Sequence, residues 1–176
     1  MPDFVRIYPN VSLPPDAELD DFVILGRAPR GHQSGDLPLT FGPGCVIRAQ
    51  TVIYAGNVIG ARFQTGHGVM IREANTIGDD VSVGTGSIVE HHVTIGNGVR
   101  LHSRVFVPEY SVLEDGCWLG PGVIVTNARY PLSRGVKERL RGSGFRPWGG
   151  RLTGEGPVAR PLDAGGNGEP WRVTAL

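Results

Sequence analysis

Three adjacent residues with proton-transferring side chains, Glu90, His91 and His92, occupy a predicted turn in the stretch VEHHVT. Two more carboxylates recur at a fixed distance from it, with Glu73 eighteen residues before His91 and Glu109 eighteen residues after it. A histidine beside carboxylates is favoured as the imidazolium and can be held in one tautomer. If the fold brings these positions together, His91 can take a proton from a nucleophile near neutral pH, as a general base does.

A six-residue repeat indicates which elements would position these residues. Cut every six residues from Phe41, the chain gives fifteen consecutive blocks, from FGPGCV to VTNARY, and the first residue of each block is apolar except for Thr65. Helices repeat every 3.6 residues and ordinary strands every two. A period of six held for ninety residues therefore predicts a short strand followed by a corner, repeated.

This pattern resembles the hexapeptide-repeat proteins over roughly residues 5–130. The resemblance implies an all-β fold, the left-handed parallel β-helix, in which three hexads make one triangular coil of eighteen residues. The first hexad residue points inward, and the fifth fills the corner beside it. Coils stack at the strand spacing of about 4.8 Å. Each fully buried Ile, Val or Leu of the inner column would stabilise the fold by roughly 1.5–3 kcal/mol.

The domain prediction is a β-helix over 1–130 with a loop insertion at 29–40, followed by an irregular tail over 131–176. The stretch PRGHQSGDLPLT at 29–40 breaks the register, and it is either a surface loop or a lid or partner contact. In the tail the hexads do not return, and 19 of the 34 residues from position 143 are Gly, Pro, Arg or Ala. Such a tail is either disordered or translated out of frame.

Stacked coils form three edges of corner residues, which are found by adding eighteen to a position. The first edge has ordinary turn formers at its third hexad positions, namely Pro43, Ala61, Asp79, Asn97 and Asp115. The second edge has Ala49, His67, Thr85, Ser103 and Pro121. The third edge is rich in functional groups, with Ala55, Glu73, His91, Glu109 and Asn127. The alternative for His91 and His67 is a purely structural corner, and His102 is expected to be a solvated strand residue.

Two stretches of the sequence indicate which function the resemblance implies. VEHHVTIG is similar to the histidine-bearing corner of bacterial sugar-nucleotide N-acetyltransferases, and WLGPGVIVTNARYP is similar to a segment of 3-amino-sugar N-acetyltransferases. The resemblance implies acetyl-CoA as acyl donor, a sugar-nucleotide acceptor, and a homotrimer with active sites between neighbouring prisms. It also implies that His91 is the general base.

The remaining roles at the third edge follow from this assignment. Glu73 or Glu109 would orient the imidazole, and Asn127 would steady the oxyanion. Further predicted substrate- or cofactor-binding residues are Thr126, Tyr110, Glu90, His92, Arg72 and His67. Cys45 and Cys117 lie four coils apart at fifth hexad positions, which predicts two buried thiols and no disulfide.

Two other functions share this fold, a non-catalytic trimeric scaffold and a zinc lyase of the γ-carbonic-anhydrase type. The lyase needs three converging histidines, whereas His91 and His92 are adjacent, so no metal is expected. The 17 basic and 17 acidic residues balance, which does not favour a nucleic-acid or membrane surface. Without a long apolar run or a signal-peptide pattern, the predicted location is cytoplasmic.

Overall fold

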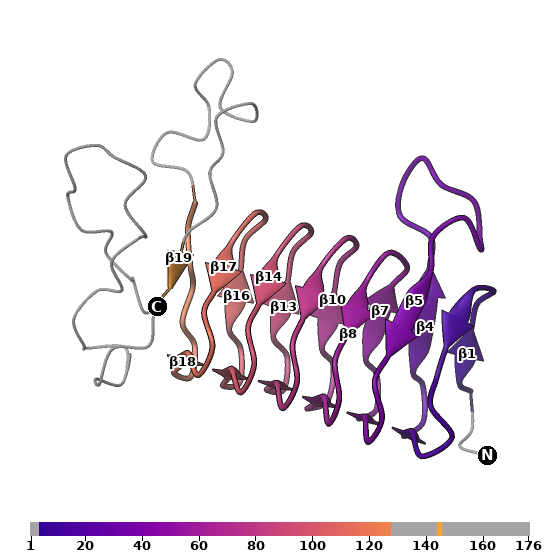
Figure 1. Cartoon of the computed structure of the whole chain (residues 1–176), viewed down its shortest axis with the longest axis horizontal. Coiled ribbons are helices and arrows are strands. Elements are labelled where there is room, and N and C mark those ends of the chain that lie inside the picture. Colours follow the sequence, from indigo (N-terminus) through magenta and orange to yellow (C-terminus); the bar gives the residue numbers. More distant parts are fainter. Residues whose placement is uncertain (1–3, 128–143, 146–176) are drawn as a thin grey trace.

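The computed structural model describes residues 4–127 and 144–145, and the regular elements of this part of the chain are short parallel strands. They form three sheets that make up the sides of a prism, seen from the side in Figure 1. Sheet A contains β1 (Arg6–Ile7), β4 (Ile24–Arg27), β7 (Val52–Tyr54), β10 (Met70–Ile71), β13 (Ile88–Val89) and β16 (Phe106–Val107). Sheet B contains β2 (Val11–Ser12), β5 (Leu39–Phe41), β8 (Val58–Ile59), β11 (Thr76–Ile77), β14 (Thr94–Ile95), β17 (Val112–Leu113) and β19 (Gly144–Phe145). Sheet C contains β3 (Glu18–Leu19), β6 (Val46–Ile47), β9 (Gln64–Thr65), β12 (Ser82–Val83), β15 (Arg100–Leu101) and β18 (Trp118–Leu119).

The register confirms the eighteen-residue coil. Ile71 pairs with Val89, and Val89 pairs with Val107, each eighteen residues further along the chain. Successive strands belong to different sheets, so each strand meets its neighbour only after a full turn. The architecture is the predicted left-handed parallel β-helix, in which the third edge joins sheet A to sheet B, the first edge joins B to C, and the second joins C to A.

An inserted loop interrupts the helix between β4 and β5, where a loop over 29–40 was predicted. Leu25 pairs with Ile53, twenty-eight residues later and ten more than one coil, because residues 28–38 leave the helix between β4 and β5. This loop projects from the row of corners along the upper side of Figure 1. The predicted loop extended to residue 40, whereas Leu39 is fully buried in β5 and already belongs to the helix.

The core is the predicted inner column. Every first hexad residue from Phe41 to Val125 is buried, and so is every fifth residue from Cys45 to Val123. Thr65 is the one polar residue among these first hexad positions, and its hydroxyl accepts a hydrogen bond from the Arg48 N–H at 2.9 Å. Cys45 and Cys117 are buried and unbridged, as predicted.

Corners turn through the fourth hexad residue, which has a positive φ in all three rows. Glycine fills many of these positions, but Arg62, His92 and Tyr110 adopt the same conformation with φ of 55–60°. At the first edge the third hexad residues form a ladder: Ala61 N–H donates to Asp79 Oδ1, and Asp79 N–H donates to the side chain of Asn97, both at 2.8 Å. This supports the interpretation of Asp79 as a structural turn residue.

One part of the predicted tail is described, and it differs from expectation. Gly144–Phe145 forms β19, which pairs in parallel with β17, so the helix gains another strand of sheet B after the hexads were expected to stop. The remaining tail residues, 128–143 and 146–176, lie outside the described residues. Within the described part, no helix has the length and apolarity needed to cross a bilayer.

Two glycines of one corner should respond differently to alanine. A Cβ at Gly96 would overlap Asp115 Oδ1 and lie 2.6 Å from the Asp115 nitrogen, whereas a Cβ at Gly98 would meet nothing within 4 Å. Gly98→Ala should cost about 1 kcal/mol, because φ there is +65°. Gly96→Ala should cost about 2–3 kcal/mol, since the next coil must move. Urea unfolding measures both, and equal losses would contradict the tight stacking.

Candidate functional site

The third edge brings the predicted site residues onto one vertical seam. The His92 N–H donates to the Glu73 carbonyl, and the Tyr110 N–H donates to the His91 carbonyl, both at 3.2 Å. The Asn127 side chain donates from Nδ2 to the Glu109 carbonyl at 3.0 Å. The backbones of Glu73, His91 and Glu109 therefore stack in consecutive coils, as the eighteen-residue spacing predicted.

Three aromatic rings cluster at the middle of this seam. The His91 and His92 rings are 5.0 Å apart and nearly perpendicular, and the Tyr110 ring lies 5.5 Å from His91 and 5.2 Å from His92. Nδ1 of His91 and Nδ1 of His92 are 2.9 Å apart, which is a hydrogen bond. His91 is half-buried, whereas His92 and Tyr110 are exposed. The Nε2 atom of His91 takes no part in the bond between the rings.

A compact cluster of charged side chains lies beside the three rings, with Arg72 and Glu73 in the coil below them and Glu90 in the same coil as His91. The Arg72 guanidinium donates two hydrogen bonds of 2.9 Å to the Glu73 carboxylate and a third of 3.3 Å to Glu90. Burial opposes ionisation of Glu73, but the Arg72 hydrogen bonds, the backbone N–H and the charges of Arg72 and His91 together bring its pKa below its ordinary value. The Tyr54 ring lies under Arg72, with 5.4 Å between the guanidinium carbon and the ring centre. Glu73 is thus a carboxylate near His91 whose direct partner is Arg72.

The upper end of the seam carries the other predicted binding residues. Asn127 is half-buried, and its side-chain nitrogen carries a second hydrogen besides the one donated to Glu109. Thr126 is exposed, and Glu109 is half-buried. The structure brings these residues together along one edge, and their catalytic and binding roles remain predictions.

Two buried asparagines, which the sequence analysis did not assign to the site, hold the seam from inside. Asn57 Nδ2 donates to the carbonyls of Tyr54 and Arg72, and Asn75 Nδ2 donates to Arg72 as well, all at 2.8 Å. Asn75 Oδ1 accepts the Val93 N–H at 2.7 Å, which ties the His91 corner to the coil below. The sequence could have indicated this role, because Asn57 and Asn75 are amides at fifth hexad positions, which point into the core.

The inserted loop, residues 28–38, leaves the helix at the same edge. Its last carbonyl, on Pro38, accepts the Gly56 N–H at 2.7 Å, and a Cβ at Gly56 would lie 3.4 Å from Leu37 and 3.8 Å from the Glu73 Cβ. The loop therefore borders the lower end of the seam.

The other histidines lie elsewhere. His67 is exposed on the second edge, where its carbonyl accepts the Gly86 N–H, so the structure does not bring it to His91. His102 lies on the outer face of sheet C with its ring 5.9 Å from the Trp118 ring. Among the described residues, no three His, Cys, Asp or Glu side chains are grouped so as to hold a metal ion.

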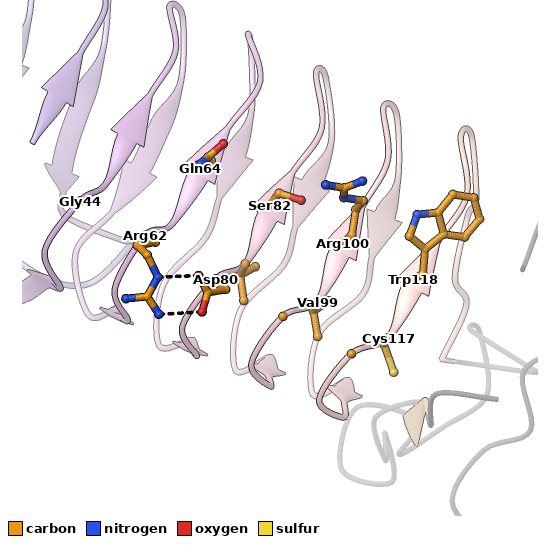
Figure 2. Close-up of a pocket in the computed structure, with 12 residues that line it drawn as sticks. Gly44, Arg62, Gln64, Asp80, Ser82, Val99, Arg100, Cys117 and Trp118 are labelled. Atoms are coloured by element: carbon orange, nitrogen blue, oxygen red, sulfur yellow. Dashed lines mark hydrogen bonds and ion pairs between the residues drawn. The ribbon is translucent and has the colours of Figure 1, made fainter. Parts of the chain in front are cut away.

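Figure 2 shows a hollow of about 480 Å³ on sheet C, beside the first edge. The bidentate Arg62–Asp80 ion pair closes one side, with bonds of 2.5 and 2.6 Å, and Arg100 and Trp118 line the strands above. This face is opposite the third edge within one prism. The hollow was not predicted from sequence. Gly98 and Gly116 could have indicated it, because glycine leaves these corners of the hollow without side chains.

The buried thiols are protonated near neutral pH. Burial raises the pKa of the Cys117 thiol to about 11, and burial also raises that of Cys45. A thiol is a much weaker nucleophile than a thiolate. Neither buried thiol is therefore well suited to act as a nucleophile.

The Arg72–Glu73 pair predicts acid-sensitive stability. The pKa of Glu73 is lower in the folded chain than in the unfolded chain, so the unfolded chain binds the proton more readily. Its contribution is complete above about pH 5 and is lost as the pH falls through the lowered pKa. Glu73→Gln should cost about 0.5–1 kcal/mol at pH 7 and much less at pH 3. Urea unfolding at both pH values tests this, and a constant difference would contradict it.

The comparisons with known proteins agree with this geometry. A family model described as bacterial transferase hexapeptide (six repeats) matches residues 76–109, which include the His91 corner and reach Glu109. A comparison with curated proteins gave no match. The family match supports an acyltransferase-type enzyme or a scaffold on the same helix, and proteins of this family typically use acyl-CoA and commonly form trimers. The matched repeats and the three-sided parallel coil together fit the hexapeptide-repeat superfamily of left-handed β-helix proteins.

Proposed function

We propose that the chain is an acyl-CoA-dependent acyltransferase that acetylates the amino group of a sugar nucleotide, with His91 as the general base. The observation that supports this is the His91 corner, where a half-buried imidazole is stacked between the coils of Glu73 and Glu109. Carboxylates, an imidazole, a tyrosine and an amide line up on one edge, whereas the first edge carries a structural ladder at the same positions. This contrast favours catalysis over a plain scaffold.

The proposed reaction is a direct transfer. Acetyl-CoA is a substrate here and supplies the activated carbonyl carbon. The acceptor amine attacks that carbon, the carbon–sulfur bond breaks, and coenzyme A leaves as a thiolate. Nε2 of His91 removes one proton from the amine nitrogen as the amide bond forms and returns it to the thiolate. The negative charge of Glu73 interacts with His91 and stabilises the imidazolium between these steps.

Two groups on the third edge fit the remaining roles, which are to stabilise the oxyanion and to hold the acceptor. The second N–H of the Asn127 amide can donate to the oxygen that becomes negative when the carbonyl is attacked. The exposed Tyr110 ring, with 41% of its surface accessible, offers a flat apolar face to a sugar or base ring. Direct transfer needs no nucleophilic side chain, which is consistent with the raised pKa of Cys117.

An outer face of the helix supports the homotrimer. The sixth hexad residues of sheet A form an apolar row that is only partly covered, consisting of Val52, Met70, Ile88, Phe106 and Ile124. The matching row on sheet C is mixed, with polar Gln64, Ser82 and Arg100 between Val46 and Trp118. Burying one apolar face against a neighbouring prism would bring the adjacent third edge into a cleft between protomers.

His91→Ala tests the catalytic assignment. Loss of a general base typically lowers the rate by about 100-fold or more. We expect that loss in acetyl-CoA consumption assays with a panel of nucleotide amino sugars, with thermal unfolding unchanged. His67→Ala is the matched control, because it removes the same side chain from a third hexad position on another edge. If His91→Ala retains full turnover with an active acceptor, the base is the substrate itself or another residue.

Ile88→Glu tests the trimer. A charge in the centre of the apolar row would be buried without a partner on association, at a cost of several kcal/mol. We expect the variant to be monomeric by light scattering at concentrations where the wild type is trimeric. Thr94→Glu is the control, because it places the same charge at an exposed sixth hexad position of sheet B. An unchanged mass for Ile88→Glu, or a monomeric wild type, would exclude sheet A as the trimer interface.

A further inference from the structure

The hydrogen bond between the two histidines constrains their protons. An Nδ1···Nδ1 contact of 2.9 Å requires one ring to donate an Nδ1–H and the other to accept on a bare Nδ1. Two arrangements of a neutral pair satisfy it. If His91 donates, its Nε2 carries the lone pair and can act as a base. If His92 donates, Nε2 of His91 carries a hydrogen and cannot.

The surroundings of the two rings are not equivalent. His91 is half-buried and interacts electrostatically with the Glu73 carboxylate, whereas His92 is exposed. The Glu73 carboxylate therefore attracts positive charge on His91. When His91 takes a proton on Nε2, its Nδ1–H becomes a charged donor to His92, and a charge-assisted hydrogen bond is stronger than a neutral one. The arrangement in which His91 donates is thus the one that is strengthened when the proton is taken.

Resting on the proposed function above, we propose that His92 is a positioning residue: its Nδ1 accepts the Nδ1–H of His91, which holds His91 in the tautomer whose Nε2 is the base. This assigns to a neighbouring imidazole the orienting role that sequence analysis gave to Glu73 or Glu109. The Arg72 bonds to both Glu73 oxygens are consistent with this reassignment, because they occupy the carboxylate as an acceptor. Glu73 then acts on His91 through its charge.

The backbone makes His92 unusually easy to test. Its φ is +57°, a conformation that glycine adopts without strain, and glycine occupies the same hexad position at Gly56. His92→Gly therefore removes the ring without damaging the corner. Ala74→Gly, one coil below with φ of +59°, is the matched control because it relieves the same strain and removes no acceptor. His92→Asn restores an acceptor, because the Asn Oδ1 can reach toward the His91 Nδ1–H and Asn tolerates a positive φ.

The first measurement is the His91 tautomer, read from ¹⁵N–¹H correlation spectra of the full chain labelled in its five histidines. We expect the wild type, His92→Asn and Ala74→Gly to have His91 mainly in the Nδ1–H form, and His92→Gly to shift toward Nε2–H. The second is turnover, where kcat should fall about tenfold in His92→Gly with KM changed less, and recover most of the way in His92→Asn.

The two measurements separate this inference from the proposed function. If no acceptor is turned over by the wild type, the proposed function fails, while the spectra still decide whether His92 sets the tautomer. A His91 spectrum that is the same in the wild type and His92→Gly overturns the inference. So does a shifted tautomer with unchanged kcat, because the hydrogen bond would then serve only the structure. A shifted tautomer with the expected loss and rescue of kcat supports it.

Discussion

Backbone N–H groups throughout this chain donate to carbonyls one coil further on, as Met70 does to Ser87 at 3.0 Å and Arg72 does to Val89 at 2.8 Å. Because these bonds join residues about eighteen positions apart, any change in the length of a coil would displace everything beyond it. The helix tolerates extra residues only at a corner, where the chain can leave and return in register. Residues 28–38 do so, and β5 resumes the ladder beside β2 with Val11 opposite Leu39. The constraint thus fixes which side chains share an edge over the whole described helix.

How far the structure could be predicted from sequence follows from this constraint. The period assigned the buried residues, the three edges and the stacking of Glu73 below His91, because these depend only on the backbone repeat. It did not assign side-chain partners. Glu73 binds Arg72, its neighbour in sequence, and His91 binds His92, because rotamers depend on the local shape and charge of each corner. The added strand β19 was not predicted because the hexads end at residue 130, so the sequence sets no register for residues 144–145.

Positive φ at the fourth hexad position shows where the helix carries side chains that strain its backbone. Such a conformation costs an ordinary residue roughly 1–2 kcal/mol relative to the right-handed region, and glycine avoids this cost. On the third edge His92 and Tyr110 occupy these positions in consecutive coils, next to each other in space. Nothing in the coil's hydrogen bonding requires a ring at either site. Residues on the other two edges adopt the same conformation, for example Arg62 and Gln50. The third edge differs in placing two contacting rings at these positions.

A difference among the corners helps to explain why functional side chains gather on the third edge. Where the first edge begins, the second hexad residue is glycine in four coils and glutamate in the fifth, at Glu114. A Cβ at Gly78 would overlap the corner of the next coil, 2.6 Å from Asn97 Oδ1 and 2.9 Å from its nitrogen. Those four corners therefore project no side chain from the second hexad position. The third edge has Arg72 and Glu90 at this position, and the buried amides of Asn57 and Asn75 bind the Arg72 carbonyl from inside. With this different support, three consecutive residues of one corner, Glu90, His91 and His92, carry functional side chains at the proposed site.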